Sequence, residues 1–276
     1  MSNSSPLLID ETNLSYAWAK AFLHIIDNPG KEISPLVVSI TGFTDGKPQE
    51  NKDIRQSLDK CLADNGEQKI DTVANTIFPH SLWRPSKDKR KELFERYLKI
   101  FPRIKAVELN KNRRGIYFER LIAFEPKKPD QPKINQLEFI ISEYHKGKEN
   151  PKRSGVRRSM FQASIFDPRE DHISTPYLPF PCLQHVSFVP QGETLTLNAF
   201  YATQQLLNKA YGNYLGLCRL GNFMAHEMEL TFSRMNCFVG VAKLEHIGKE
   251  KNIPKKSPIL TPVIEACQKV IISRTD

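Results

Sequence analysis

The chain has 276 residues, a length that fits one large domain or two small ones and can bury a substantial core. Its composition, 39% hydrophobic and 26% charged, is ordinary for a globular protein, and no apolar run reaches the roughly 18 residues of a membrane-spanning helix. The formal net charge of +9 indicates a surface that attracts phosphates, either of nucleotides or of nucleic acid.

The first part of the chain is predicted to contain three helices and one strand. Apolar residues recur at helical spacing over 13–27, and Asn-Pro-Gly at 28–30 ends that helix. Residues 35–41 predict a short strand, and one helix near 52–64 is expected inside the polar segment that follows. The stretch 87–100 predicts a surface helix, whose apolar side would be formed by Leu93, Phe94, Tyr97 and Leu98.

A strand, a loop and a helix are predicted next. Residues 116–123 alternate in a mostly apolar pattern that favours a strand with little exposed face. The run 125–133 holds three prolines and predicts a loop. A helix follows, in which Asn135 and Glu138 have the spacing of a capping box and Gly147 suits the C-terminal cap. Its apolar face would be Leu137, Ile140, Ile141 and Tyr144.

Strands dominate the following segment, and a buried helix closes it. Strands are predicted over 158–166, 184–190 and 194–201, and Gln191-Gly192-Glu193 predicts a hairpin turn between the last two. Residues 213–228 predict a helix that is apolar nearly all round, which is typical of a buried helix. No internal repeat and no sharp boundary divides the chain, so one domain is predicted.

The charge pattern, the cysteines and the N-terminus indicate the setting of the protein. Basic residues gather at 87–91, 111–114, 146–158 and 249–256, and each cluster alone is as consistent with solvated loops as with anion binding. The five cysteines are odd in number and scattered, which favours reduced thiols over a disulfide framework. The N-terminus lacks the pattern of a secretory signal. We therefore predict a soluble cytoplasmic protein that does not enter a membrane.

The common chemical motifs are absent from the sequence. It contains no Walker loop, no Gly-x-Gly-x-x-Gly, no Cys-x-x-Cys and no His-Glu-x-x-His, and His226-Glu227 has no second histidine four positions on. The seven histidines offer no metal-ligand spacing, so no metal site is expected. One feature remains: Pro179-Phe-Pro-Cys182 leads directly into the predicted hairpin and then the buried helix.

Five short blocks in one order carry a family resemblance. They are Gly115-Ile-Tyr-Phe-Glu-Arg120, Asn135-Gln-Leu137, Val156-Arg-Arg-Ser159, Pro181-Cys182-Leu183, and Gly212-Asn213 with Met224-Ala225. In this order they resemble the Tyr-Gly strand, Asp-Gln-Leu helix start, Ser-Arg-Arg strand start, Pro-Cys-His motif and Phe-Asn helix of the thymidylate synthase family. Between Cys182 and Asn213 the match needs no gap.

The resemblance implies a fold and an assembly. We expect an α/β (α+β) protein with a three-layer thymidylate synthase-like fold, a mixed sheet and a long buried helix, forming a single domain over 1–276. Residues 115–230 match best, and residues 1–80 are divergent. The family also implies a homodimer.

The resemblance assigns the chemistry to Cys182 and Asn213. A pyrimidine C6 is a poor electrophile, so the family uses a thiolate to add there, and Cys182 holds that position. A nearby cation would lower the pKa of this thiol. The single amide of Asn213 can read the O4 and N3–H edge of a uracil-like base. From the residues alone, Cys182 could instead be a buried core residue and Asn213 a helix cap.

Four further residues are placed by the same resemblance. Arg157 and Arg158 match an arginine pair that reaches across the dimer to the substrate phosphate, and forked donors suit phosphate. Tyr117 belongs to the matched substrate-binding block. Glu92 is a second catalytic candidate, matching a glutamate that organises proton transfer. The alternatives are an exposed strand start for the two arginines and a solvated helix residue for Glu92.

Several family residues are replaced in this chain. Ala202 stands where an arginine holds the phosphate, Gln205 where an aspartate binds the folate pterin, and Leu183 where a histidine follows the cysteine. Lys243 and Glu245 replace the histidine and tyrosine that hold the sugar hydroxyl. Losing one charge-assisted phosphate contact costs about 1.5–3 kcal/mol. Ordinary thymidylate synthesis is therefore not expected.

Two functions remain open on this reading. In the first, the protein binds a uracil-like pyrimidine nucleotide and transfers a one-carbon group to C5 through Cys182, with methylenetetrahydrofolate as the cofactor implied by the family. In the second, it is a catalytically degenerate subunit whose basic surface binds a nucleotide, nucleic acid or protein partner in a larger assembly.

Overall fold

A mixed β-sheet forms the centre of the computed structural model, which describes residues 5–28, 30–85, 89–108, 112, 115–128, 130–150, 157–174, 181–245 and 257–272. The main sheet runs in the order β1-β3-β9-β8-β7-β6, with β2 paired to the end of β9. Neighbouring strands β1–β3 and β8–β9 are parallel, and the other neighbours are antiparallel. The strands are β1 (Leu7–Glu11), β2 (Glu32–Ile33), β3 (Leu36–Ile40), β6 (Gln162–Ser164), β7 (Leu183–Gln191), β8 (Thr194–Gln205) and β9 (Thr231–Lys243), with a separate hairpin of β4 (Phe43–Thr44) and β5 (Lys47–Pro48).

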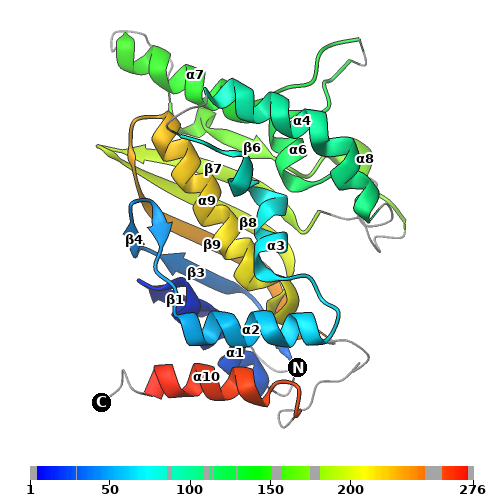
Figure 1. The fold of residues 1–276 in the computed structure, drawn as a ribbon. Helices are drawn as coiled ribbons and strands as arrows, with labels where there is room; N and C mark the ends of the chain where they lie inside the picture. Colours follow the sequence, from blue (N-terminus) through cyan, green and yellow to red (C-terminus); the bar gives the residue numbers. More distant parts are fainter. Residues whose placement is uncertain are drawn as a thin grey trace.

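Helices cover one face of this sheet. Figure 1 shows α9 lying along that face, with α1, α2 and α10 together at one end of the molecule and α4, α6, α7 and α8 at the other. The helices are α1 (Leu14–Asp27), α2 (Lys52–Asp64), α3 (Ile70–Ile77), α4 (Arg90–Val107), α6 (Tyr117–Ile122), α7 (Gln136–Glu149), α8 (Pro168–Asp171), α9 (Tyr211–Glu227) and α10 (Thr261–Ile272). Short 3-10 turns at His80–Leu82 and Arg158–Met160 and a π turn at Leu206–Ala210 complete the described elements.

Glycines on α9 let its neighbours approach closely. A Cβ on Gly216 would lie 2.7 Å from the carbonyl oxygen of Ala74 in α3, and a Cβ on Gly212 would lie 2.6 Å from the Val73 side chain. Contacts this short are impossible for a side chain, so α3 packs directly on the α9 backbone. This packing explains why α9 is buried on nearly every side, as its sequence predicts.

The structure confirms the α+β class, the mixed sheet and the long buried helix. It also confirms the helices predicted over 13–27 and 52–64, the cap of α7 by Asn135, and the hairpin of β7 and β8. Each of these has a strong local signal. The helix caps are Asn side chains that accept backbone N–H bonds, and the strands alternate in burial.

Three local predictions are wrong. The segment 116–123 is predicted as a strand, but residues 117–122 form helix α6. In this helix Phe118, Leu121 and Ile122 are buried, and Arg120 can also be buried because it pairs with Asp171. The segment predicted as strand 158–166 begins as a 3-10 turn, and only Gln162–Ser164 pairs. Helix α7 continues through Gly147 to Glu149 and ends at Asn150.

Candidate functional site

Cys182 lies immediately before β7, where backbone pairing with β8 fixes its position. The backbone N–H of Ala202 donates to the Cys182 carbonyl at 3.1 Å, and Thr203 Oγ1 donates to Cys182 Sγ at 3.8 Å. Cys182 is half-buried, whereas the other four cysteines are buried. The core-residue interpretation therefore fits Cys61, Cys218, Cys237 and Cys267 better than it fits Cys182.

Helix α6 brings Tyr117 to the same place. The Tyr117 hydroxyl bonds the backbone of Leu183 and Cys182, and burial is the main cause that raises the pKa of Tyr117. Tyr201 on β8 also lies near Cys182 and Tyr117, which both contribute to the raised pKa of its fully buried phenol. Two of the residues that the resemblance assigns to one pocket, Cys182 and Tyr117, are thus neighbours.

The charges around Cys182 do not activate it in this state. Burial, the largest cause, raises the pKa of the thiol, and the negative charge of Glu245 raises it further. The hydrogen bond from Thr203 and the positive charge of Lys209 lower it by less. Because the net shift is upward, the thiol is protonated at neutral pH and is not a resting thiolate.

We predict that Cys182 alkylates slowly at neutral pH. Only the thiolate reacts, and the raised pKa means that the rate of iodoacetamide modification keeps rising above pH 9, the ordinary value for a cysteine. Replacing Glu245 with glutamine removes a neighbouring negative charge, so Glu245→Gln is expected to shift this rate profile to lower pH. Intact mass spectrometry of quenched samples follows the reaction. A profile that is already flat at pH 7 contradicts the prediction.

Asn213 lies inside helix α9 and does not cap it. The helix continues directly from the π turn at 206–210, and its first residue is Tyr211, so the capping interpretation is wrong. The Asn213 side chain is only 5% exposed, yet its amide makes no hydrogen bond with any residue in the described ranges. Its amide atoms are not fully buried and keep some contact with solvent, so the amide is available to a ligand.

Two other polar atoms near the end of β8 also lack partners. Tyr201 Oη and Gln204 Nε2 are buried, and no described residue bonds them. The Gln204 carbonyl oxygen accepts from the Tyr214 hydroxyl at 2.9 Å, so only the amide nitrogen is left over. Buried polar atoms without partners are rare in proteins, and the occurrence of two of them at the end of β8, beside the first turn of α9, marks this region as a candidate binding site.

The remaining predicted site residues lie on the surface. Arg157 and Arg158 are both exposed at the 3-10 turn before β6, and neither forms an ion pair within the described part of the chain. Glu92 is exposed on the first turn of α4, a helix that packs against α6 and the turn at 80–82. This position favours the solvated helix residue for Glu92, while the two arginines remain free to bind an anion.

The replaced family residues show how the site differs. Lys243 is paired with Glu32 at the end of the sheet, at 3.1 Å. Glu245 instead places a carboxylate near Cys182. Sequence reasoning missed Lys209, whose positive charge lies close to the Cys182 thiol. Ala202, at the position where the resemblance expects an arginine, carries no charge. Its signal in the sequence is weak, because a lysine four residues before Asn213 matches no motif.

The folate cofactor that the resemblance implies depends on two parts of the chain. At the position where the resemblance expects a pterin-binding carboxylate, Gln205 offers a neutral amide. Helix α10, near the C-terminus, packs on α1 and α2 with Val263 and Cys267 fully buried, so this segment is part of the core. Methylenetetrahydrofolate stays a prediction for the experiment below, and no chemical step is derived through it.

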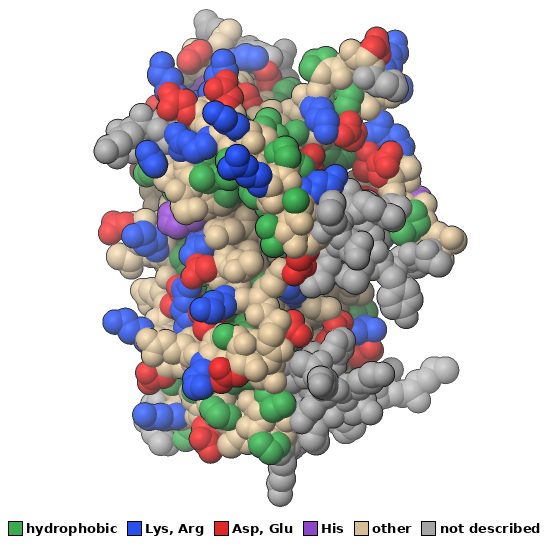
Figure 2. Space-filling view, turned by 45° about the vertical axis from the view of Figure 1, so that its right-hand side comes forward, with side chains coloured by type: hydrophobic (Ala, Val, Ile, Leu, Met, Phe, Trp, Pro, Cys, Tyr) green, Lys and Arg blue, Asp and Glu red, His purple; other side chains and the backbone are tan. Residues whose placement is uncertain are grey.

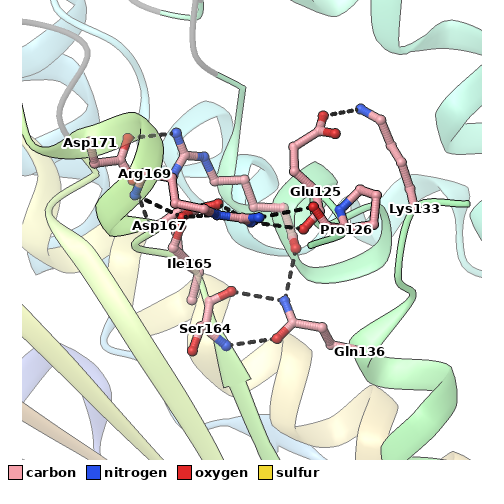
Figure 3. Close-up of polar contacts among 10 residues, drawn as sticks. Glu125, Pro126, Lys133, Gln136, Ser164, Ile165, Asp167, Arg169 and Asp171 are labelled. Atoms are coloured by element: carbon pink, nitrogen blue, oxygen red, sulfur yellow. Dashed lines mark hydrogen bonds and ion pairs between the residues drawn. The ribbon is translucent and has the colours of Figure 1, made fainter. Parts of the chain in front are cut away.

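A buried ion pair holds α6, and therefore Tyr117, in place. Arg120 donates to Asp171 through Nη1 at 2.6 Å and Nη2 at 3.0 Å, and Nη1 also reaches the Ile165 carbonyl. Figure 3 shows the surrounding contacts: Arg169 bonds Asp167 and the carbonyls of Glu125 and Pro126, and Gln136 bonds Ser164. A hollow of about 570 Å³ lies beside this network. Because its arginines are paired with carboxylates, we assign the network a structural role.

The structure describes only some residues of the basic clusters that the sequence contains. Residues 249–256 lie outside the described residues, as do most of 111–114, part of 87–91 and residues 151–156 of the cluster 146–158. On the face drawn in Figure 2, Lys and Arg side chains are interspersed with Asp and Glu. Among the described residues, no cluster of His, Cys, Asp and Glu could hold a metal ion. No described helix is long and apolar enough to cross a membrane.

No protein-family model matches the sequence, and no curated protein matches it. The function therefore has to be inferred from the site itself.

Proposed function

We propose that the protein binds a pyrimidine nucleotide with a uracil-like base in the region formed by Cys182, Tyr117 and Asn213. The observation that carries the proposal is the amide of Asn213, which forms no hydrogen bond in the described ranges although the residue is only 5% exposed. Lys209, four residues earlier, lies close enough to the half-buried Cys182 thiol to affect its pKa. A uracil edge has one acceptor at O4 and one donor at N3, and a single Asn amide can complement both.

The covalent step of the proposal uses Cys182 alone. The Sγ–H bond breaks, Sγ bonds to C6 of the base, and the electron pair of the C5=C6 bond takes up a proton at C5. The product is a 5,6-dihydropyrimidine thioether, and no oxidant or reductant is consumed. Lys209, which favours the thiolate, assists the step, and Glu245 opposes it until the ligand displaces or screens its charge.

Covalent capture of a 5-fluorouracil nucleotide tests the proposal. The protein is incubated with 5-fluorodeoxyuridylate, with and without methylenetetrahydrofolate, and then weighed by intact mass spectrometry. We expect an adduct of one nucleotide on Cys182 that is absent from Cys182→Ser. A further mass increase with methylenetetrahydrofolate would support one-carbon transfer.

The matched control is another cysteine that the structure buries. Cys267→Ser is expected to keep the adduct, since Cys267 lies in α10, away from β7. Absence of any adduct and of any saturable nucleotide binding, while iodoacetamide still modifies Cys182, would overturn the proposal.

The open face of the sheet supports a homodimer. No described helix covers the face opposite α9, and the strand register aligns Leu8, Val37, Phe238 and Phe200 in one row across four strands. Phe200 and Phe238 stack with ring centroids 5.6 Å apart, yet both are exposed, as is Leu8. A continuous row of exposed apolar side chains is expected to be buried against another surface. We propose that this surface is the same sheet face of a second copy of the chain.

A charge in this row is expected to prevent the dimer. Phe238→Asp places a carboxylate in the centre of the proposed interface, where it cannot be paired with its own symmetry copy. Light scattering after size-exclusion chromatography should give the monomer mass for this variant and the dimer mass for the wild type. Phe139→Asp, at an exposed phenylalanine on α7, is the control that should remain dimeric. A monomeric wild type contradicts the proposal.

A second function is favoured by the two exposed arginines. Arg157 and Arg158 are unpaired within the described chain, as expected for residues that contact a phosphate backbone. If the protein is a degenerate subunit, it binds nucleic acid in a salt-dependent way, and Arg157→Gln with Arg158→Gln reduces that binding. Unchanged retention on RNA and DNA in this variant would exclude the arginines from such a role.

A further inference from the structure

A second cavity lies on a different side of helix α9 from Asn213. It has a volume of about 180 Å³, well above the roughly 10–15 Å³ that one water needs. Leu215, Arg219 and Asn222 line it from α9, at the helical spacing of i, i+4 and i+7. At 100° per residue, Asn213 is about 160° from Leu215 around the helix. The cavity is therefore separate from the Cys182 region.

The wall opposite α9 comes from the β4–β5 hairpin and the turn at 80–82. Lys47 of the hairpin, His80 of the turn and Trp83 after it all line the cavity. The hairpin is seated firmly, because the Asn222 amide packs so closely on Gly46 that a Cβ there would lie 1.7 Å from Asn222 Oδ1. Phe43 also packs on Phe232 with ring centroids 4.5 Å apart. The cavity is thus built by fixed elements.

Two polar atoms of this wall are buried without partners. Trp83 Nε1 and His80 Nδ1 have no hydrogen bond to the described chain, and Trp83 as a whole is 9% exposed. The other tryptophan gives the comparison, since the Nε1 of Trp18 donates to the Leu206 carbonyl at 2.9 Å. An indole N–H can only donate, so a ligand that binds at Trp83 Nε1 would have to supply a hydrogen-bond acceptor.

The charges of the cavity favour an anion. Glu50 is held by Arg55 and by the Tyr211 hydroxyl, and Asp71 bridges Arg55 and Arg219. Of these groups, Arg219 and Glu50 line the cavity together with Lys47, which has no ion pair in the described ranges, so the lining holds two cations and one carboxylate. Burial first, and then the charges of Arg219 and Lys47, lower the pKa of His80, so its ring is neutral near pH 7.

We propose that this cavity binds a small oxyanion, a carboxylate or phosphate group, which accepts a hydrogen bond from Trp83 Nε1 and is held by Lys47 and Arg219. Neutral His80 can donate from Nδ1, and the Asn222 amide can donate as well. The one carboxylate in the lining, Glu50, already accepts bonds from Arg55 and from the Tyr211 hydroxyl, so a cation or a neutral donor would find fewer partners there.

Calorimetric titration tests the proposal with two probes, inorganic phosphate and malonate. The tighter of the two identifies whether the oxyanion is a phosphate or a carboxylate. We expect saturable binding of at least one probe and a loss of about tenfold or more in Lys47→Gln, because a charge-assisted hydrogen bond is removed. Lys99→Gln, an exposed lysine on α4, is the matched control and should bind as the wild type does.

Two more variants locate the anion. Trp83→Phe keeps an aromatic ring and removes the donor, so it should weaken binding by several-fold. A thermal melt checks that the variant is still folded at the temperature of the titration. Binding should persist in Arg157→Gln with Arg158→Gln and in Cys182→Ser, which separates this cavity from the proposed nucleotide site. Equal affinities in Lys47→Gln and Lys99→Gln, or no saturable binding of either probe, would overturn the proposal.

Discussion

Replacing Asp171 with alanine is expected to lower the free energy of unfolding by about 3–5 kcal/mol, because it leaves the Arg120 guanidinium buried without its partner. The Asp171 side chain is fully buried, and its two carboxylate oxygens accept two bonds from Arg120 and one from the Asp167 backbone N–H. Urea denaturation followed by circular dichroism measures the change. Helix α6 carries Tyr117, so a folded Asp171→Ala is also expected to bind a nucleotide more weakly.

The double variant separates the lost pair from general damage. Arg120→Met with Asp171→Leu removes both charges and fills the space with apolar atoms, so it should recover much of the stability that Asp171→Ala loses. Asp64→Ala breaks a pair with Lys60 at the surface and should leave the free energy of unfolding almost unchanged. A loss below about 1 kcal/mol for Asp171→Ala, as in an exposed pair, would show that the Arg120 contact is not a buried ion pair in solution.

Replacing Asn213 with aspartate is expected to reverse the base preference of the proposed nucleotide site. A carboxylate accepts from the N4 amino group of cytosine but can no longer donate to uracil O4, which it repels. Each mismatched group is worth roughly a factor of ten to a hundred in binding. Competition between deoxyuridylate and deoxycytidylate, measured by calorimetry, gives the ratio in wild type and variant.

Asn213→Ala provides the control for this reversal. It removes the amide without adding a charge, so both nucleotides should bind more weakly and with little preference. A thermal melt of each variant checks that the buried carboxylate of Asn213→Asp has not unfolded α9. If the preference for uracil is the same in Asn213→Asp as in the wild type, Asn213 does not read the base.

The elements with a strong local signal could be predicted from the sequence. Helices α1, α2 and α7 begin at Asn13, Asn51 and Asn135, whose side chains accept backbone N–H bonds, and their apolar residues repeat at helical spacing. The hairpin of β7 and β8 turns at Gly192, whose φ of +59° suits glycine. The buried α9 follows from its apolar residues. Local sequence determines these features because their causes lie within a few residues.

The sequence identified Cys182 as a candidate residue directly before the hairpin, but it did not reveal which residues surround the thiol. The apolar sequence of 116–123 fits a strand or a buried helix equally well, and only the distant partner Asp171 makes burial of Arg120 possible in α6. The same holds for the thiol: Glu245 follows β9 and Lys209 lies in the π turn, so their effect on the pKa of Cys182 depends on long-range packing.

The cavity beside Trp83 belongs entirely to the tertiary structure. Lys47, Trp83 and Arg219 are far apart in the chain and match no motif, and they line one cavity only because the β4–β5 hairpin rests on α9. The sequence by itself determined the capped helices, the hairpin and the buried helix, because periodicity and caps act locally. Which polar groups meet, and which are left without partners, was decided by the packing of segments that the sequence separates.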